Sequence, residues 1–564
     1  MRIVESELMR RVVLLALLAA VAGWCARQPV RARHGMVATR EAHATDIGLA
    51  VLESGGNAID AAVAVGFALA VTHPAAGNIG GGGFLLARFA DGRTVFLDFR
   101  ERAPEKASHD MYLGPDSKVT KDSVLGYRAS GVPGTVRGLE AAHQKYGRKK
   151  WAELVDPAVR LAAEGFPVSY GLARSLHGKD TSGRLSQFPE SKRIFLNGGK
   201  FYEAGERLVQ PELARVLARI RDRGARDFYE GETAQLLTAD MKEHGGLIAL
   251  EDLKNYRAIE RQPLTGSYRG YAIVTAPPPS SGGVGILQML GVLEGSGYEK
   301  PGFGSAATVH YMAETMRRYF ADRSEYMGDP DFYSVPVARL LSPQYIAGLR
   351  NTIDPERATA SASIHPGKLE SHESSETTHY SIVDAEGNAV AVTYTLNNSY
   401  GSAVTATKLG FLLNNEMDDF AAKPGEPNLF GLVQGEANAI QPRKTPLSSM
   451  TPTMVLRDGK LYLVLGSPGG PTIINTVLEV LVNVIDFGMN VADAVDAPRL
   501  HHQWMPDVLR MERGFSPDTV ALLKARGHTI ELENAQGEVA AILAKDGWLE
   551  GSADPRTEGT AKGY

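Results

Sequence analysis

Two threonines at the two ends of a predicted hairpin are the residues best suited to chemistry. Thr377 follows a polar, Ser-rich segment and precedes an alternating run over 378–383; turn residues fill 384–388, and alternation returns over 389–395. These features predict a β-hairpin, and a regular register puts Thr395 opposite Thr377. We therefore expect the two hydroxyls to lie side by side.

A threonine hydroxyl is a weak nucleophile unless a base accepts its proton. If the bond between Glu376 and Thr377 is cut, the new α-amine lies within reach of the hydroxyl on the same residue and can act as that base. An unperturbed α-amine has a pKa of about 8, so a large fraction is neutral near neutral pH. Taken alone, Thr377 and Thr395 would equally suit ordinary strand positions, where threonine is common.

A second predicted hairpin leads into a glycine-rich junction. Its strands are expected over 451–456 and 461–465, and Gly469 and Gly470 then precede a largely apolar, buried helix over 473–485. Backbone N–H groups at such a strand-to-helix junction lie at the positive end of the helix dipole. The junction could therefore stabilise an oxyanion, although two glycines also suit a simple turn.

The remaining elements predict an antiparallel sheet covered by helices. Helices are expected over 41–54 and 58–71, the second capped by Asn57. A glycine-rich turn over 77–83 leads into a strand over 84–89. That turn has neither the Gly-Lys-Ser/Thr of a phosphate loop nor the preceding strand of a dinucleotide fingerprint, so tight backbone packing is its predicted role.

The middle of the chain differs in composition from the segment that precedes Thr377. The pattern over 132–349 is mostly helical, and we find no internal repeat. Between 355 and 376 the composition shifts to Ser, Ala, Glu and His, which is typical of a mobile surface connector.

The totals exclude several classes of protein. The 564 residues carry 60 basic and 65 acidic side chains, a formal charge of -5, with no long basic block. Nucleic acid therefore has no electrostatic support as a partner. The single cysteine, Cys25, excludes an internal disulfide and a cysteine metal site.

The N-terminus has the pattern of a secretory signal over 1–22. Arg10 and Arg11 precede an apolar run over 12–21, which ends in a small-x-small cleavage pattern. The run is short for a bilayer, and no later stretch reaches the ~18 apolar residues of a spanning helix. We expect an exported protein, periplasmic or secreted. Lipid anchoring at Cys25 is an alternative, which its bulky neighbour Trp24 disfavours.

Five motifs resemble those of the γ-glutamyltranspeptidase (glutathione hydrolase) family, and the similarity runs from about residue 34 to residue 564. The motifs occupy 377–381, 393–397, 414–420, 446–450 and 466–470. The resemblance implies an α+β fold of the N-terminal nucleophile hydrolase superfamily, a four-layer αββα sandwich of two antiparallel sheets between helical layers. It also implies cleavage between Glu376 and Thr377 into a large subunit, 23–376, and a small catalytic subunit, 377–564. The two subunits would form one intertwined unit.

The resemblance also assigns the catalytic residues. Thr377 would attack the γ-amide of glutathione or a related γ-glutamyl compound and retain a γ-glutamyl ester. Water, or the amine of an amino acid or dipeptide acceptor, would then release the ester. Thr395 would assist the nucleophile, and Gly469 and Gly470 would form the oxyanion hole. No cofactor and no metal are implied.

The donor's α-carbon carries a carboxylate and an ammonium, so its site must present opposite charges close together. By resemblance, Arg100, Ser448 and Ser449 bind the carboxylate; Asn397, Glu416 and Asp419 hold the ammonium. An arginine suits the first task because it can donate two N–H groups to one carboxylate. Singly, Arg100 would more often be a surface charge and the serine pair a polar turn.

Two positions vary within the family, and three histidines invite a metal hypothesis. Glu416 stands where some members have Gln, and its added charge should favour an α-amino donor. Phe430, in a predicted lid over 424–431, stands where certain bacterial members have Tyr, so a hydrogen bond from that phenol is absent. We interpret His379, His501 and His502 as structural, because no carboxylate stands at metal-site spacing.

Three alternatives stay open. A β-lactam acylase of the same superfamily would take a glutaryl group, which lacks the ammonium; Glu416 and Asp419 argue against it, because carboxylates facing no cation are costly to bury. A poly-γ-glutamate hydrolase would need a more open groove. An inactive, unprocessed protein that binds γ-glutamyl peptides belongs to a different class.

Overall fold

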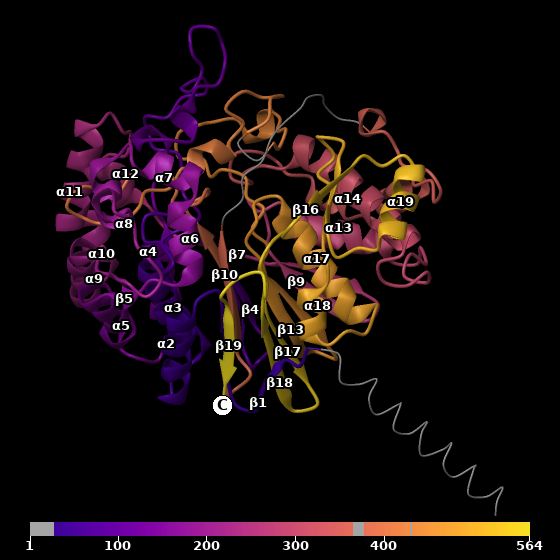
Figure 1. The fold of residues 1–564 in the computed structure, drawn as a ribbon, viewed down its shortest axis with the longest axis horizontal. Helices are drawn as coiled ribbons and strands as arrows, with labels where there is room; N and C mark the ends of the chain where they lie inside the picture. Colours follow the sequence, from indigo (N-terminus) through magenta and orange to yellow (C-terminus); the bar gives the residue numbers. More distant parts are fainter. Residues whose placement is uncertain (1–26, 365–376, 429–430) are drawn as a thin grey trace, which may run out of the picture.

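Two antiparallel sheets are stacked on each other, and helices cover both outer faces (Figure 1). The computed structural model describes residues 27–364, 377–428 and 431–564. The predicted αββα sandwich is confirmed. The predicted leader, Cys25, Glu376 and Phe430 lie outside the described residues.

The first sheet has seven strands, joined throughout by antiparallel pairs. In spatial order they are β1 (Val30–Ala32), β18 (Trp548–Ala553), β17 (Ala540–Lys545), β13 (Lys460–Gly466), β12 (Thr453–Arg457), β9 (Tyr271–Thr275) and β8 (Leu264–Tyr268). Its outer face packs against the apolar helices α13 (Gly282–Leu293) and α17 (Thr472–Ile485), and α14 (Ala306–Tyr326) packs against α13. The second predicted hairpin and the helix after it are confirmed as β12, β13 and α17.

The second sheet also has seven antiparallel strands. In order they are β19 (Thr560–Gly563), β2 (Met36–Thr39), β10 (Thr378–Val383), β11 (Ala389–Thr395), β3 (Gly82–Arg88), β4 (Thr94–Asp98) and β7 (Ile259–Arg261). Its outer face packs against helices that include α2 (Ala42–Glu53), α3 (Ala58–Thr72) and α4 (Thr135–Tyr146), and α5 (Trp151–Glu164) packs against α3. Strands from before and after residue 377 are therefore interleaved in one sheet.

The local chemistry of the sequence explains the elements that were predicted well. β10 and β11 have the predicted bounds, and Thr378 pairs with Tyr394, so the register that faces Thr377 with Thr395 is confirmed. The side chain of Asn57 accepts from the Asp60 N–H at 2.9 Å, and the Asp60 carboxylate accepts from the Asn57 N–H at 3.0 Å. This capping box starts α3 where the sequence predicts it.

The sequence-based prediction missed one hairpin in the largely helical 132–349 segment. β8 and β9 are joined by Arg269 and Gly270, both with positive φ (48° and 83°), and β9 pairs with β12. A two-residue turn with positive φ at both positions matches the twist of a hairpin. β8 escaped prediction because it is an edge strand with a weak apolar pattern.

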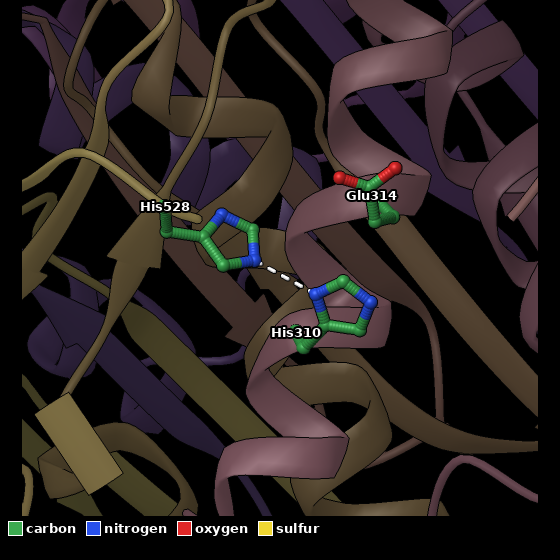
Figure 2. A group of neighbouring side chains, drawn as sticks. All are labelled: His310, Glu314 and His528. Carbon is green, nitrogen blue, oxygen red and sulfur yellow. Dashed lines mark hydrogen bonds between the residues drawn. The ribbon is translucent and has the colours of Figure 1, made fainter. Parts of the chain in front are cut away.

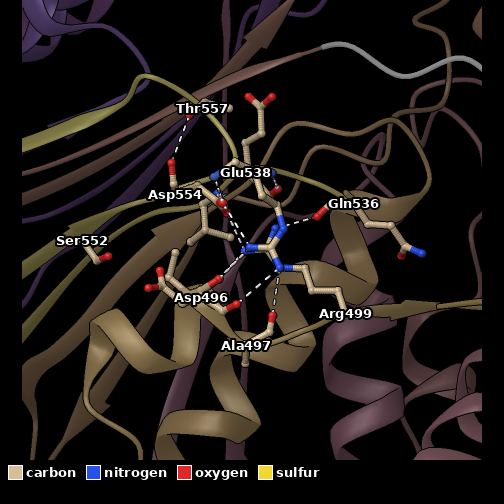
Figure 3. A network of polar contacts seen from close by, with 12 residues as sticks. Asp496, Ala497, Arg499, Gln536, Glu538, Ser552, Asp554 and Thr557 are labelled. Carbon is tan, nitrogen blue, oxygen red and sulfur yellow. Dashed lines mark hydrogen bonds and ion pairs between the residues drawn. The ribbon is translucent and has the colours of Figure 1, made fainter. Parts of the chain in front are cut away.

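A buried network of ion pairs and hydrogen bonds connects segments near the C-terminus (Figure 3). The Arg499 guanidinium pairs with Asp554 at 2.5 Å and donates to the carbonyls of Gln536 and Val495. Arg556 also pairs with Asp554, at 3.1 Å, and these contacts connect the strand β18 region to helix α18 (Val491–Asp496). Across the described ranges, no helix combines the length and apolarity needed to cross a membrane.

Candidate active site

Thr377 and Thr395 meet at the end of the β10–β11 hairpin. Thr377 directly precedes β10, Thr395 ends β11, and the two Oγ1 atoms lie 3.4 Å apart, with Thr377 donating. Both side chains are buried. The Thr395 hydroxyl also accepts from the backbone N–H of Asn397 at 2.8 Å. The Thr377 hydroxyl is therefore held in place, and Thr395 is itself oriented by the backbone that follows it.

The glycine junction lies at the start of α17, beside Thr377. Gly469 and Gly470 have φ values of +134° and +55°, and a Cβ at residue 469 would lie 2.3 Å from Thr472 Oγ1. Both conformations favour glycine. Gly470 lines the same cavity as Thr377, whereas Gly469, the residue before Gly470, does not line it. The positive end of the α17 dipole thus faces the cavity that contains the threonine hydroxyl.

A single guanidinium joins the acidic residues of the site. Arg100, which follows β4 and is 1% exposed, forms ion pairs through NH1 with Glu416 and through NH2 with Asp419. The two acidic residues occupy the short helix η5 (Glu416–Asp419). A third carboxylate, that of Glu101, lies 3.5 Å from Arg100 NH1. We call Arg100, Glu101, Glu416 and Asp419 the Arg100 cluster.

The Arg100 cluster holds more acidic than basic groups in a buried place. Burial raises the pKa of Glu101 to about 7, although Arg100 opposes the shift. Burial likewise raises the pKa of Glu416 well above its usual value and that of Asp419 to a lesser degree, again against Arg100. Both carboxylate oxygens of Glu101 and Oε2 of Glu416 have no hydrogen-bond partner among the described residues. The cluster therefore has spare acceptors and takes up a proton readily.

Three further predicted residues complete the cavity wall. Ser448 Oγ accepts from the Met450 N–H at 3.1 Å, and Ser449 Oγ accepts from Arg323 NH2 at 3.3 Å. Asn397 donates through Nδ2 to the Asn415 carbonyl at 3.0 Å and has a φ of +78°. Such a backbone conformation is uncommon outside glycine and occurs often at functional sites.

The structure thus gathers nine of the predicted residues around one small cavity. They are Arg100, Thr377, Thr395, Asn397, Glu416, Asp419, Ser448, Ser449 and Gly470. The cavity has a volume of about 20 Å³, room for one or two water molecules. The sequence-based prediction did not include Glu101 or Arg323. Only its position next to Arg100 could have indicated Glu101, and nothing in the helical sequence around Arg323 indicates a functional site.

The histidines that invited a metal hypothesis use most of their ring nitrogens in hydrogen bonds within the protein. Nε2 of His502 has no such bond among the described residues and lies 3.4 Å from an Asp507 carboxylate oxygen. His379 bonds through Nδ1 to Thr393 Oγ1 at 2.8 Å and through Nε2 to Ser381 Oγ at 3.1 Å, and burial lowers its pKa to about 3. His501 accepts from Asn475 Nδ2 at 2.7 Å and bonds to Gln503. The Nδ1 atom of His502 accepts from the Trp504 N–H at 3.1 Å.

Figure 2 shows a different group of potential metal ligands, formed by His310, Glu314 and His528. His310 Nδ1 lies 2.8 Å from His528 Nε2, so the two rings form a hydrogen bond with each other. The Glu314 carboxylate already binds Arg318 at 2.7 Å and lies 3.6 Å from Arg317. Two adjacent guanidiniums neutralise this carboxylate and disfavour a cation there.

Comparisons with known proteins agree with this geometry. The family model described as Gamma-glutamyltranspeptidase matches residues 44–564. The chain is 52% identical to the glutathione hydrolase proenzyme of Escherichia coli (strain K12), over 94% of this chain and 91% of that protein. It is 38% identical to the acylase ACY 1 proenzyme of Pseudomonas sp. (strain SE83), over 95% and 94%.

A solved structure extends the similarity to the whole fold. The cephalosporin acylase from Bacillus halodurans superposes with a TM-score of 0.85 at 29% identity, covering 96% of this chain and 97% of that chain. The family model, the relatives and the cavity around Thr377 lead to one conclusion. The chain belongs to the gamma-glutamyltranspeptidase family and shares the fold of the N-terminal nucleophile hydrolases.

Proposed function

We propose that the chain is a self-processing γ-glutamyltranspeptidase that cleaves the γ-glutamyl amide bond of glutathione and related compounds. One observation carries the proposal: the Thr377–Thr395 hydroxyl pair lines the same cavity as Arg100, Glu416 and Asp419 of the Arg100 cluster. A nucleophile and charged groups suited to a zwitterion therefore face one cavity.

The reaction uses the chain's own groups. The Thr377 hydroxyl attacks the γ-carbonyl carbon, and its proton passes to the α-amine that cleavage has freed. Backbone N–H groups of Gly469 and Gly470 stabilise the oxyanion. The C–N bond then breaks, the leaving amine takes the proton, and a γ-glutamyl ester stays on Thr377. Water, or the amine of an amino acid or dipeptide, attacks the ester and restores the hydroxyl.

The Arg100 cluster favours a zwitterionic donor. Without a ligand, Arg100 is paired with Glu416 and Asp419. A donor can exchange these pairs by placing its carboxylate against Arg100 and its ammonium against the two side chains. Because a zwitterion adds no net charge, this exchange avoids the cost of an uncompensated buried ion. A glutaryl donor would add a negative charge to a cluster with three carboxylates, which disfavours the acylase alternative.

We further propose cleavage between Glu376 and Thr377 into subunits 23–376 and 377–564. The interleaved strands of the second sheet support this division, since β10 and β11 lie between β2 and β3 and would hold the two pieces together. The leader pattern over 1–22 supports export to the periplasm or the medium.

The test is the intact mass and N-terminal sequence of the purified protein after incubation at neutral pH, followed by a γ-glutamyl amide assay. We expect two chains, the smaller beginning at Thr377, and turnover. Thr377→Ala should stay a single chain with turnover reduced roughly 10⁴-fold or more. Thr377→Ser, which keeps a hydroxyl, is the matched control and should be cut.

Other outcomes would favour the alternatives. An uncut wild-type chain that still binds γ-glutamyl peptides would indicate an inactive binding protein. A cut enzyme that prefers a glutaryl amide would indicate an acylase, and one that prefers long γ-linked polymers a poly-γ-glutamate hydrolase. Normal cleavage of Thr377→Ala would remove Thr377 as the nucleophile.

A further inference from the structure

We propose that Arg323 is a positioning residue for the donor carboxylate, acting through the hydroxyl of Ser449 and through the segment that carries Ser448. The inference rests on the proposed function, because it assumes an α-carboxylate in the donor. Arg323 lies on α14, is 2% exposed, and lines the same cavity as Arg100 and Thr377.

The hydrogen bond between Arg323 and Ser449 runs from the guanidinium to the serine oxygen. A guanidinium has only donors. Arg323 NH2 donates to Ser449 Oγ at 3.3 Å, so this bond uses a lone pair of the serine and leaves its O–H free for another acceptor. Ser449 lines the cavity, and a donor carboxylate there would be such an acceptor.

A second contact connects Arg323 to the other serine. Arg323 Nε donates to Ser281 Oγ at 3.0 Å, and Ser281 Oγ donates to the Ser448 carbonyl at 2.8 Å. The Ser281 N–H also donates to that carbonyl, at 2.8 Å. Arg323 therefore orients Ser281, which in turn holds the backbone of Ser448.

The charge of Arg323 is balanced less directly than that of neighbouring arginines, because its acidic neighbour Asp419 acts on it without an ion pair among the described residues. On the same helix, Arg317 and Arg318 both lie against Glu314. Among the ion pairs of the described residues none includes Arg323, and its NH1 atom is buried without a hydrogen-bond partner there. A buried cation with an unused donor is costly unless a ligand supplies the missing acceptor. A carboxylate is the ligand with the matching charge.

The experiment compares three p-nitroanilide donors. The γ-glutamyl amide carries both charged groups, the glutaryl amide lacks the ammonium, and the 4-aminobutanoyl amide lacks the carboxylate. We expect Arg323→Met to lower kcat/KM about 10- to 100-fold for the two carboxylate donors, mainly through KM, and less than about 3-fold for the 4-aminobutanoyl amide. Arg323→Lys, which keeps the charge, should recover part of the loss.

The matched control is Arg318→Lys, equally buried on the same helix but remote from the cavity, which should leave the donor ratio unchanged. Equal losses on all three donors for Arg323→Met would overturn the inference and indicate a structural role. If that variant does not fold or is not cut, the double-mutant cycle of Arg323→Lys with Ser449→Ala decides. Coupled effects on the carboxylate donors support the inference, and additive effects overturn it. A wild-type enzyme without γ-glutamyl turnover would instead contradict the proposed function.

Discussion

Two of the buried groups of arginines and carboxylates, the Arg499 network and the Arg100 cluster, differ in how completely their atoms are used. In the Arg499 network (Arg499, Glu512, Asp554 and Arg556), two guanidiniums meet two carboxylates. Most of their remaining donors and acceptors bind backbone groups, such as the Gln536 carbonyl at 2.6 Å, and Arg499 Nε is the exception, with no hydrogen-bond partner among the described residues. In the Arg100 cluster, three carboxylates surround one guanidinium and several oxygens have no hydrogen-bond partner among the described residues.

The difference separates a structural network from a binding site. The Arg499 network has balanced charges, and all of its carboxylate oxygens accept hydrogen bonds, so its function is to hold segments together. Buried acceptors without hydrogen-bond partners raise the free energy of the folded protein. A charged ligand that binds in the adjacent cavity can supply the missing donors and lower that free energy. Removing a charge should therefore cost stability in the first group and substrate preference in the second.

The largest effect on stability is expected for Asp554→Asn. The change leaves Arg499 and Arg556 short of a counter-charge in a buried place, which typically costs about 3–5 kcal/mol. The denaturation midpoint, measured by urea or heat, should fall clearly. Asp496→Asn, at a partly exposed carboxylate near the same network, is the control and should cost at most about 1 kcal/mol. An unchanged midpoint for Asp554→Asn would contradict the structural role of the network.

A substitution in the Arg100 cluster should change activity more than stability. Asp419→Asn removes one of three carboxylates that share a guanidinium, so we expect little change in the denaturation midpoint. It should lower kcat/KM for the γ-glutamyl amide about 10- to 100-fold, because a charged hydrogen bond to the ammonium is lost. The glutaryl amide should be affected less. Equal losses on both donors would remove Asp419 from the ammonium site.

The smallest expected effect is a change in pH dependence. Because the pKa of Glu101 is raised to about 7, its negative charge appears as the pH rises through that value and should then favour the donor ammonium. The ratio of kcat/KM for γ-glutamyl over glutaryl amides should rise a few-fold between about pH 6 and 8, since one partly screened charge contributes on the order of 1 kcal/mol. The ratio cancels the titration of the Thr377 α-amine, which both donors share.

Glu101→Gln is the variant that checks this assignment. The ratio should become flat with pH, and a retained rise would assign the titration to another group. Whereas the donor preference rises with pH, the stability that Glu101 contributes falls with pH, because its folded-state pKa lies above the ordinary value of 4.5. The folded state therefore binds the extra proton, and the contribution of Glu101 to stability falls as the pH rises from about 4.5 to about 7. The glutamine variant should lose this part of the pH dependence.

The sequence by itself determined the features that depend on neighbours along the chain. The hairpin over 378–395 has its predicted strands because alternation and turn chemistry are local, and the register of Thr377 with Thr395 follows from them. The capping box of Asn57 and the glycine junction before α17 are equally local. The family resemblance also identified nine residues around the cavity, although it could not show which of them are paired without a ligand.

Only the tertiary structure decided the contacts between distant segments. Arg100 is 316 residues from Glu416, and Arg323 is 126 residues from Ser449. No local pattern could predict that Arg323 faces the cavity, whereas the pair of Arg318 with Glu314, four residues apart on the same helix, is local. Charge balance in a protein interior depends on which side chains folding brings together and removes from water, and spacing along the chain does not encode that.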